Sequence, residues 1–344
     1  MRRPCLFMDL SIITINYKTP ELLSELLSSL NSVRNGELDF EVIVVNVTPE
    51  DGSGMMVNEK FPWVKQIVDT RNLGFSGNNN IGLKEATGRY VLFLNSDTTV
   101  PKGTLSKMVT FMDSNKDVGA ATCYVELASG GMDPDCHRGF PTPWASLTYF
   151  LGLEKLFPHS HLFGQYHQFY KDLTKTHEID ACAGAFLLMP RAVGEKIDLR
   201  DIAAGETSGV KSAKTPEVRE CGDSRLAGHE VASVVDPRPA WWDEDFFFYG
   251  EDLDLCWRIR EAGYKIMFYP HVKITHHKGG SSGIREESKD VTRATEETKK
   301  RIIQETTRAM RLFYQKHLEE KYPWVVNKVV YLGINILESV RLRK

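Results

Sequence analysis

Asp97 lies at the end of an apolar run in the stretch VLFLNSDTTV, residues 91–100. Such a run is typical of a buried strand, so a carboxylate at its end needs a physical reason. One interpretation is structural, because Asp and Asn side chains cap the turns that follow strands. The other is chemical, because Asp97 with Asn95 can contribute to a site for Mg²⁺ or Mn²⁺, which bind carboxylate oxygens together with ligand phosphates. The stretch alone leaves both open.

A cluster of acids and aromatic residues occupies residues 241–255, in the sequence WWDEDFFFYGEDLDL. The pattern predicts a helix over residues 251–262, with acids in its first turn and Gly263 just past its end. A carboxylate at a helix start beside aromatic side chains is a reasonable general base, because partial desolvation raises its basicity. A solvated acidic face, with Asp254 paired to Arg258 one turn later, is the alternative.

Two histidines, His276 and His277, end the predicted strand KIMFYPHVKITHH and lead into the glycine-rich KGGSSG. Histidines at the carboxyl end of a strand are candidate ligands, and glycine and serine backbone N–H groups can bind phosphate oxygens. Imidazole slightly favours Mn²⁺ over Mg²⁺. Neither G-x-G-x-x-G after the first strand nor G-x-x-x-x-G-K-[ST] is present, which argues against dinucleotide and P-loop sites.

Alternating strands and helices must position these side chains. This order predicts an α/β fold with a mostly parallel sheet and helices on both faces, in which ligands bind beyond the carboxyl ends of the strands. Asp97 would then stand where a ligand binds. The predicted strands are residues 10–17, 40–47, 64–70 and 89–97, and the helices between them are residues 20–33 and 76–87.

The composition is that of an ordinary globular protein of 344 residues, 42% hydrophobic and 26% charged, with room for one large domain or two. A net charge of -3 with both signs interspersed excludes an extended phosphate-neutralising surface, so nucleic acid is not an expected partner. The six scattered cysteines predict reduced thiols and a cytoplasmic protein. The start MRRPCLFMDLSIITIN favours a strand over a signal peptide, and either Met1 or Met8 can be the first residue.

The remaining segments have weaker patterns. Residues 131–178, rich in aromatics and prolines, fit a substrate surface or a satellite core equally well. Residues 198–240 are polar and predict a flexible insertion. Residues 291–344 predict helices, ending in the apolar PWVVNKVVYLGINIL and the basic RLRK, which suits an interfacial helix on a membrane or a helix packed on the domain.

The order of seven blocks resembles that of family 2 glycosyltransferases, and most closely the bacterial rhamnosyltransferase-like branch that builds surface polysaccharide. The resemblance covers roughly residues 9–285, apart from the insertion. It implies a GT-A fold, a nucleotide-diphosphate-sugar donor, a divalent metal (Mg²⁺ or Mn²⁺) and an inverting displacement. The blocks are SIITINYKTPELL, FEVIVVNVTPEDGS, NLGFSGNNNIG, YVLFLNSDTTV, AGAFLLMPR, WWDEDFFFYGEDLDLCWRIREAGYKI and HHKGGSS.

Carried over to this sequence, the resemblance makes Asp97 the last acid of the D-x-D metal motif and His276 a second metal or diphosphate contact. Asp252 matches the catalytic base, with Glu251 beside it. Where the family has Asp-Asn after the second strand, this chain has Asn46-Val47, which leaves the donor nucleotide open. The expected substrate-binding residues are Ile15, Tyr17, Asn46, Asn72, Gly77, Asn95, Arg138, Gly184, Ala185, Trp242 and Asp243.

The expected organisation is a GT-A domain over residues 9–290 and a C-terminal helical extension over residues 291–344 that can contact a membrane. Residues 1–130 would bind the nucleotide sugar, and residues 131–290 would bind the acceptor and carry out catalysis. The expected activity transfers a sugar, with rhamnose as a candidate, to a glycan or lipid-linked glycan. Two alternatives stand beside it: a non-catalytic nucleotide-sugar-binding protein on the same scaffold, and a nucleotidyltransferase, whose basic glycine-rich loop is missing from NYKTPELL.

Overall fold

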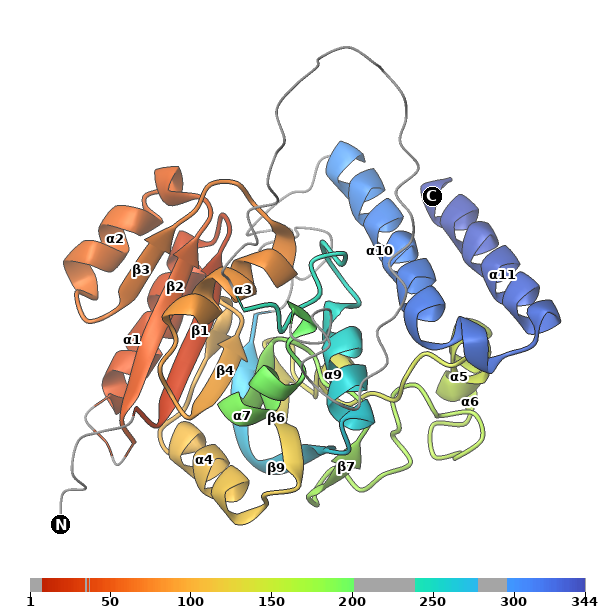
Figure 1. The fold of residues 1–344 in the computed structure, drawn as a ribbon, viewed down its shortest axis with the longest axis horizontal. Coiled ribbons are helices and arrows are strands. Elements are labelled where there is room, and N and C mark those ends of the chain that lie inside the picture. Colours follow the sequence, from red (N-terminus) through yellow and green to blue (C-terminus); the bar gives the residue numbers. More distant parts are fainter. Residues whose placement is uncertain (1–7, 35, 37, 201–238, 278–295, 344) are drawn as a thin grey trace.

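A computed structural model of the chain describes residues 8–34, 36, 38–200, 239–277 and 296–343. Within these ranges the chain builds one nine-stranded sheet flanked by helices (Figure 1). The strand order is β3-β2-β1-β4-β8-β6-β9-β5, and β7 pairs with β9 outside this path. The strands are β1 (Leu10–Asn16), β2 (Phe40–Asn46), β3 (Lys65–Val68), β4 (Tyr90–Leu94), β5 (Thr98–Thr99), β6 (Val118–Leu127), β7 (His177–Ile179), β8 (Phe186–Pro190) and β9 (Lys265–His276).

The sheet is mostly parallel, which confirms the fold class predicted from the sequence. β1 pairs in parallel with β2 and β4, and β2 pairs in parallel with β3. β8 lies antiparallel between β4 and β6, and the sequence pattern did not predict its direction. β9 runs parallel to β6, while β5 and β7 pair with it in the antiparallel direction. The carboxyl ends of β1, β4 and β9 therefore lie at the same edge of the sheet.

Helices cover both faces of this sheet (Figure 1). One face carries α1 (Pro20–Val33), α2 (Ser53–Lys60) and α4 (Thr104–Ser114), and the other carries α3 (Gly74–Glu85), α7 (Arg191–Lys196) and α9 (Glu251–Glu261). The other helices are α5 (Pro143–Phe150), α6 (Leu153–Leu156), α10 (Glu296–His317) and α11 (Trp324–Leu342), with 3-10 turns η1 (Pro49–Asp51), η2 (Pro134–Cys136) and η4 (Glu319–Lys321).

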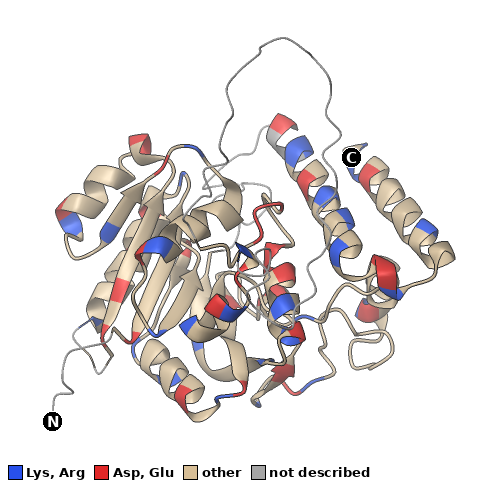
Figure 2. Cartoon of the chain, in the orientation of Figure 1, with Lys and Arg blue, Asp and Glu red and all other residues tan. Residues whose placement is uncertain are grey.

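The C-terminal helices α10 and α11 form a hairpin beside α9. Charged side chains recur along α10, whereas α11 carries few (Figure 2). Lys316 near the end of α10 pairs with Asp243 at 2.5 Å, and Arg311 pairs with Glu338 of α11 at 2.8 Å. Among the described residues, none of the helices has the length and apolar character needed to cross a membrane.

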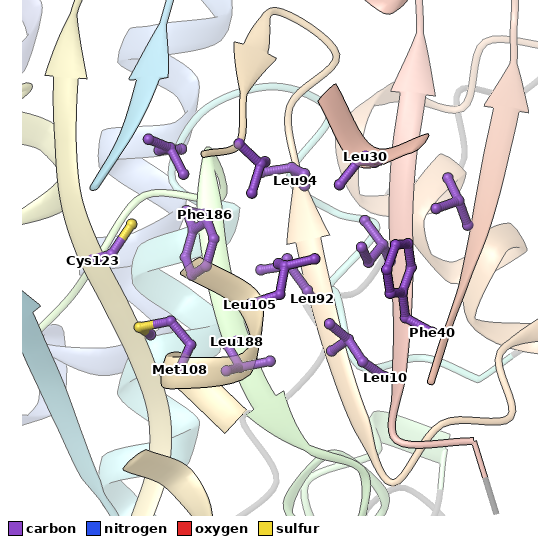
Figure 3. Packing of buried hydrophobic residues seen from close by; sticks show 14 of the residues in the cluster. Leu10, Leu30, Phe40, Leu92, Leu94, Leu105, Met108, Cys123, Phe186 and Leu188 are labelled. Atoms are coloured by element: carbon purple, nitrogen blue, oxygen red, sulfur yellow. The ribbon is translucent and has the colours of Figure 1, made fainter. Parts of the chain in front are cut away.

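The core has two layers because alternate strand residues point to opposite faces of the sheet. Leu92 and Leu94 of β4 pack under α1 and α4 (Figure 3), whereas Val91 and Phe93 pack against the α3 and α9 face. A parallel sheet buried on both faces needs such uninterrupted apolar strands. The buried strand ending before Asp97 is therefore central to the fold.

Several predicted boundaries agree with this structure. The predicted helix over residues 20–33 is α1, and the predicted helix over residues 251–262 is α9. Residues 201–238 of the predicted insertion and the segment KGGSSG lie outside the described residues. The division into domains remains a prediction.

Candidate active site

One cleft of about 1220 Å³ opens at the carboxyl edge of the sheet. It exceeds the roughly 300–1,000 Å³ typical of a site for one small molecule, so it has room for two substrates. It brings together eleven of the residues predicted from the sequence, from segments far apart in the chain. They are Ile15, Tyr17, Asn72, Asn95, Asp97, Arg138, Gly184, Ala185, Glu251, Asp252 and His276.

Asp97 and His276 meet because β5 folds back onto β9 directly after Asp97. Thr98 pairs with His276 in the antiparallel register, and the His277 N–H donates to the Asp97 carbonyl at 2.8 Å. This pairing places His276 Nε2 3.1 Å from Asp97 Oδ1. Asn95 Nδ2 lies 3.4 Å from the same imidazole nitrogen. The three side chains form one cluster at the wall of the cleft.

Asp133 holds the other side of the imidazole. Its Oδ2 lies 3.1 Å from His276 Nδ1, and Asp133 is 1% exposed. Burial alone would lower the pKa of His276, but the carboxylates of Asp97 and Asp133 outweigh it and raise this pKa to about 9. With this pKa the metal-free imidazole carries a proton on both nitrogens at neutral pH, so a metal at Nε2 would have to replace the proton shared with Asp97 Oδ1. Asp133 would still accept from Nδ1–H, which is the usual support of a metal-binding histidine.

The Asp97–His276 pair fits a divalent metal in chemistry. No group of three or more His, Cys, Asp or Glu side chains arranged for a metal occurs among the described residues. Mg²⁺ sites in enzymes of phosphate substrates commonly use one or two carboxylates and complete the shell with water and substrate phosphates. A carboxylate oxygen and an imidazole nitrogen suit Mn²⁺ as well as Mg²⁺. Among the described side chains, the pair would therefore need a bound diphosphate and water to complete the ligand shell of a metal.

The start of α9 also lines the cleft. Tyr249 and Gly250 both have positive φ, 70° and 84°, and turn the chain sharply into the helix. A tyrosine in this region costs of order 1–3 kcal/mol, and such strain clusters at functional sites. Glu251 and Asp252 follow in the first helical turn, where the unpaired N–H groups favour negative charge.

Asp252 is held by two donors. Its Oδ1 accepts from the Leu253 N–H at 2.8 Å, and its Oδ2 accepts from Arg138 Nη2 at 2.5 Å. Both side chains of the ion pair are largely buried, at 8% exposed for Arg138 and 13% for Asp252. Each carboxylate oxygen has two lone pairs, so Asp252 retains the capacity to accept a further proton.

Glu251 has a different environment although it is the adjacent residue. It is 7% exposed, and its Oε2 has no hydrogen-bond partner among the residues that the structure describes. Burial, together with the neighbouring charge of Asp252, raises the pKa of Glu251 to about 8. At neutral pH Glu251 is therefore mainly protonated, and a protonated carboxyl cannot act as a base.

Gly184 and Ala185 line the same cleft. The Asn95 N–H donates to the Ala185 carbonyl at 3.2 Å, which ties the start of β8 to the end of β4. A Cβ on Gly184 would lie 2.8 Å from the Phe75 ring, so only glycine allows this close approach.

Four predicted substrate-binding residues do not line the cleft, and each has a structural partner instead. Asn46 is fully buried, accepts from Asn16 at 3.0 Å and donates to Ser53 at 2.9 Å. Gly77 packs so closely that a Cβ would lie 2.6 Å from Leu73 Cβ.

The other two, Trp242 and Asp243, join the motif at residues 241–255 to its neighbours. Trp242 is buried, its N–H donates to Asn80 Oδ1, and its carbonyl accepts from Asn80 Nδ2. Asp243 pairs with Lys316. Their positions give them packing roles, so the prediction of substrate contact has no support for these four residues.

The sequence interpretation missed other residues of the cleft. Asp133 and Asp135 stand in the sequence DPD before Arg138, a signal that was available in the same segment. Phe247, Phe248 and Tyr249 were noted only as aromatics. Apolar residues of α5 and α11 also line the cleft, and no local pattern connected them with the active site.

Comparisons with known proteins agree with this arrangement. The family model described as Glycosyl transferase family 2 matches residues 11–192, which are 182 of the 344 residues. The chain is 32% identical over 112 residues to the minor teichoic acid biosynthesis protein GgaB of Bacillus subtilis, covering 32% of this chain and 12% of GgaB. It is 31% identical over 111 residues to the poly(ribitol-phosphate) β-N-acetylglucosaminyltransferase TarS of Staphylococcus aureus, covering 31% of this chain and 19% of TarS.

Among solved structures, the mannosyltransferase PcManGT of Pyrobaculum calidifontis, in complex with GDP-Man and Mn²⁺, is similar with a TM-score of 0.51. The alignment covers 98% of this chain and 73% of that chain at 14% identity, so the likeness concerns the fold alone. This chain matches less than a fifth of the length of GgaB or TarS. The family match over more than half of the sequence, on the segment that builds the parallel strands and Asp97, shows that the chain belongs to glycosyl transferase family 2.

Proposed function

We propose that the chain is an inverting, metal-dependent glycosyltransferase that moves a sugar from a nucleotide-diphosphate donor to a hydroxyl of a glycan or lipid-linked glycan in cell-surface polysaccharide synthesis. The observation that carries the proposal is the shared cleft, because Asp97–His276 and Asp252 line it together. An inverting transfer needs a site for the leaving diphosphate and one base for the acceptor hydroxyl.

Donor binding is assigned to the end of the cleft that contains Ile15, Tyr17 and Asn72. Asp97 and His276 would hold Mg²⁺ or Mn²⁺ beside the diphosphate, where the metal supplies charge stabilisation to the leaving group. Asn72 has a positive φ of 48°, which presents this amide from the turn before α3. Because Asn46 is engaged within the core, the donor base is recognised by other groups.

Asp252 is assigned as the base that takes the proton of the acceptor hydroxyl. Its carboxylate pairs with Arg138, whereas burial raises the pKa of the adjacent Glu251 to about 8 and keeps that carboxyl mainly protonated at neutral pH. Arg138 fixes the orientation of the Asp252 carboxylate through the 2.5 Å contact with Oδ2. The separation of roles follows the general rule that two neighbouring carboxyls with different surroundings take different protonation states.

Rhamnose is the first sugar to test, because the motif order resembles the rhamnosyltransferase-like branch. GgaB is named for minor teichoic acid biosynthesis, and TarS for transfer to poly(ribitol-phosphate), which supports a surface polymer as the product here. We place the enzyme in the cytoplasm, with peripheral contact between α11 and a membrane.

The test is release of nucleoside diphosphate from a panel of nucleotide sugars with Mn²⁺ or Mg²⁺, compared for wild type and Asp252→Asn. Loss of the base should lower the transfer rate by about 10²- to 10⁴-fold while donor binding persists. Asp245→Asn is the matched control, since this exposed acid lies close in sequence but outside the cleft. Undiminished transfer by Asp252→Asn would reject Asp252 as the base.

A further inference from the structure

The cleft extends from the catalytic residues into an apolar arm between α5 and α11. Its walls are Trp144, Leu147 and Phe150 of α5 and the half-buried Val326, Val330 and Leu337 of α11. Val325, Val329 and Ile336 border the same cleft but are more than half exposed to solvent. The same cavity is lined by Arg138, Glu251 and Asp252, so the arm is continuous with the place where an acceptor hydroxyl must lie.

The outward face of α11 is an unpartnered apolar stripe. Residues spaced by three or four positions lie on one side of a helix. The stripe consists of Val325, Val329, Leu332, Ile336 and Val340, which are 48% to 64% exposed. The opposite side of the same helix packs on α10, where Ile334 is 9% exposed and Tyr314 bonds Asn327 at 2.6 Å. An exposed apolar surface of this extent marks an interaction site.

The segment around α5 and α6 exposes similar side chains. Leu147, Phe150 and Phe157 are 47% to 51% exposed, and Leu151 and Leu156 are exposed further. Leu147 and Phe150 also line the cleft, which makes the arm the inner continuation of this apolar surface. The apolar side chains that line the arm offer few hydrogen bonds to replace those that sugar hydroxyls make with water, so a glycan chain is a poorer occupant than a hydrocarbon chain.

Cations accompany the apolar residues. Arg301 of α10 and Arg341 of α11 line the cleft, and neither has an ion-pair partner within the described ranges of the chain. Lys328 and Arg343 are exposed on or next to α11, and Figure 2 shows few acidic positions along this helix. Unpaired arginines beside an apolar channel are complementary to an anionic group joined to a hydrocarbon chain.

We propose that the apolar arm binds the hydrocarbon chain of a lipid-linked acceptor, with its phosphate or diphosphate near Arg301 and Arg341, while the stripe of α11 and the exposed face of α5 rest on the bilayer. The inference rests on the proposed function and selects a lipid-linked acceptor over a free glycan. A second copy of the chain would also cover the stripe, but it would not account for a channel that leads inward to Asp252.

The first test is co-flotation with vesicles of phosphatidylethanolamine and phosphatidylglycerol, with and without a long-chain polyprenyl diphosphate. Wild type should bind, and more tightly when the polyprenyl diphosphate is present. The double variant Val329→Glu/Ile336→Glu should bind about tenfold more weakly or worse, because each change removes a buried apolar contact. Gln304→Glu is the matched control, since it adds a charge at an exposed position of α10 outside the cleft, and it should bind as wild type does.

Tryptophan fluorescence gives an independent readout. Trp144 and Trp324 are 41% and 67% exposed, whereas Trp241 and Trp242 are buried. Lipids brominated on their chains should quench wild-type emission and should quench the double variant little. Circular dichroism would confirm that the double variant is folded, as expected for side chains that are more than half exposed.

Three results would overturn the inference. In the first, wild type binds neither kind of vesicle, and in the second, the double variant binds as tightly as wild type. In the third, wild type is a stable dimer and the double variant is a monomer. Arg341→Gln distinguishes binding to the diphosphate of the polyprenyl lipid from binding to the phosphate of phosphatidylglycerol. It should weaken binding to vesicles with the polyprenyl diphosphate more than to vesicles without it, and an equal effect would reject the diphosphate contact. Vesicle binding by a wild type that releases nucleoside diphosphate from no donor would instead reject the proposed function.

Discussion

Replacing Glu251 by Gln should stabilise the protein increasingly as the pH rises from 5 to 7. Glu251 is buried, its Oε2 has no partner within the described part of the chain, and its pKa is raised to about 8 from the ordinary 4.5. Between these values the unfolded chain releases a proton that the folded chain keeps. Stability therefore falls as the pH rises through this window. The amide is neutral in both states and removes this loss.

The size of the effect follows from the shift. One pKa unit corresponds to about 1.36 kcal/mol, so wild type should lose up to about 2.7 kcal/mol relative to Glu251→Gln between pH 5 and pH 7. With an unfolding entropy of about 2.1 cal/mol/K per residue, or about 0.7 kcal/mol/K for the 344-residue chain, this is about 4 °C in Tm.

Scanning fluorimetry of both proteins at several pH values would measure the difference. Glu261→Gln, an exposed acid at the other end of α9, should follow wild type at every pH. Parallel wild-type and Glu251→Gln curves would show that Glu251 ionises normally in the fold. A difference of the opposite sign would show that the folded state favours the carboxylate, and it would remove the argument that assigns the base to Asp252 alone. Glu251→Gln should also retain transfer activity, since one neutral group replaces another.

Two further predictions concern groups that support the site. Asp254→Asn should lower the free energy of unfolding by about 3–5 kcal/mol, because Asp254 pairs with Arg258 at 2.8 Å and with His317 at 2.7 Å in a buried cluster between α9 and α10. Urea unfolding would measure this loss, and the exposed control Asp245→Asn should lose under about 1 kcal/mol. Equal losses for the two variants would contradict the reasoning. Asp133→Asn should raise the Mn²⁺ concentration needed for transfer by about 10- to 100-fold, because it weakens the contact that orients His276. Activity should recover at high Mn²⁺ concentration. An unchanged Mn²⁺ titration would argue that His276 does not bind the metal.

The fold could be predicted largely from local pattern, and the exceptions have a physical cause. The apolar strands β1, β2 and β4, the proline-started α1 and the acid-started α9 have signals in their own sequences. The direction of β8 has no such signal, because four of its five residues are buried and a short apolar run has the same pattern in either direction. Strand direction depends on how the chain returns to the sheet, which a short apolar segment does not encode.

The site shows the same division. Asp97, Asp252 and His276 were predicted because each stands at a strand end or helix start within a recognisable block. The partnership of Asp133 with His276 depends on the register of two strands, since Asp133 follows β6 and His276 ends β9 beside it. Asn46 is the opposite case. Its position at the end of β2 predicted a contact with a ligand, but its side chain forms hydrogen bonds with Asn16 of β1 and Ser53 of α2.

The helix-strand unit of α9 and β9 explains why motif order is informative in this chain. α9 starts at the cleft with Asp252 and leads away from it, Gly263 turns the chain at φ 87°, and β9 returns beside β6 to place His276 at the same edge. Asp252, the proposed base, and His276, the proposed metal contact, therefore come from the two ends of one continuous segment. Asp97 joins them because β5 pairs with the last residues of β9. Asp97, Asp252 and His276 thus reach one cleft through this unit and the end of β4, although they lie far apart in the sequence.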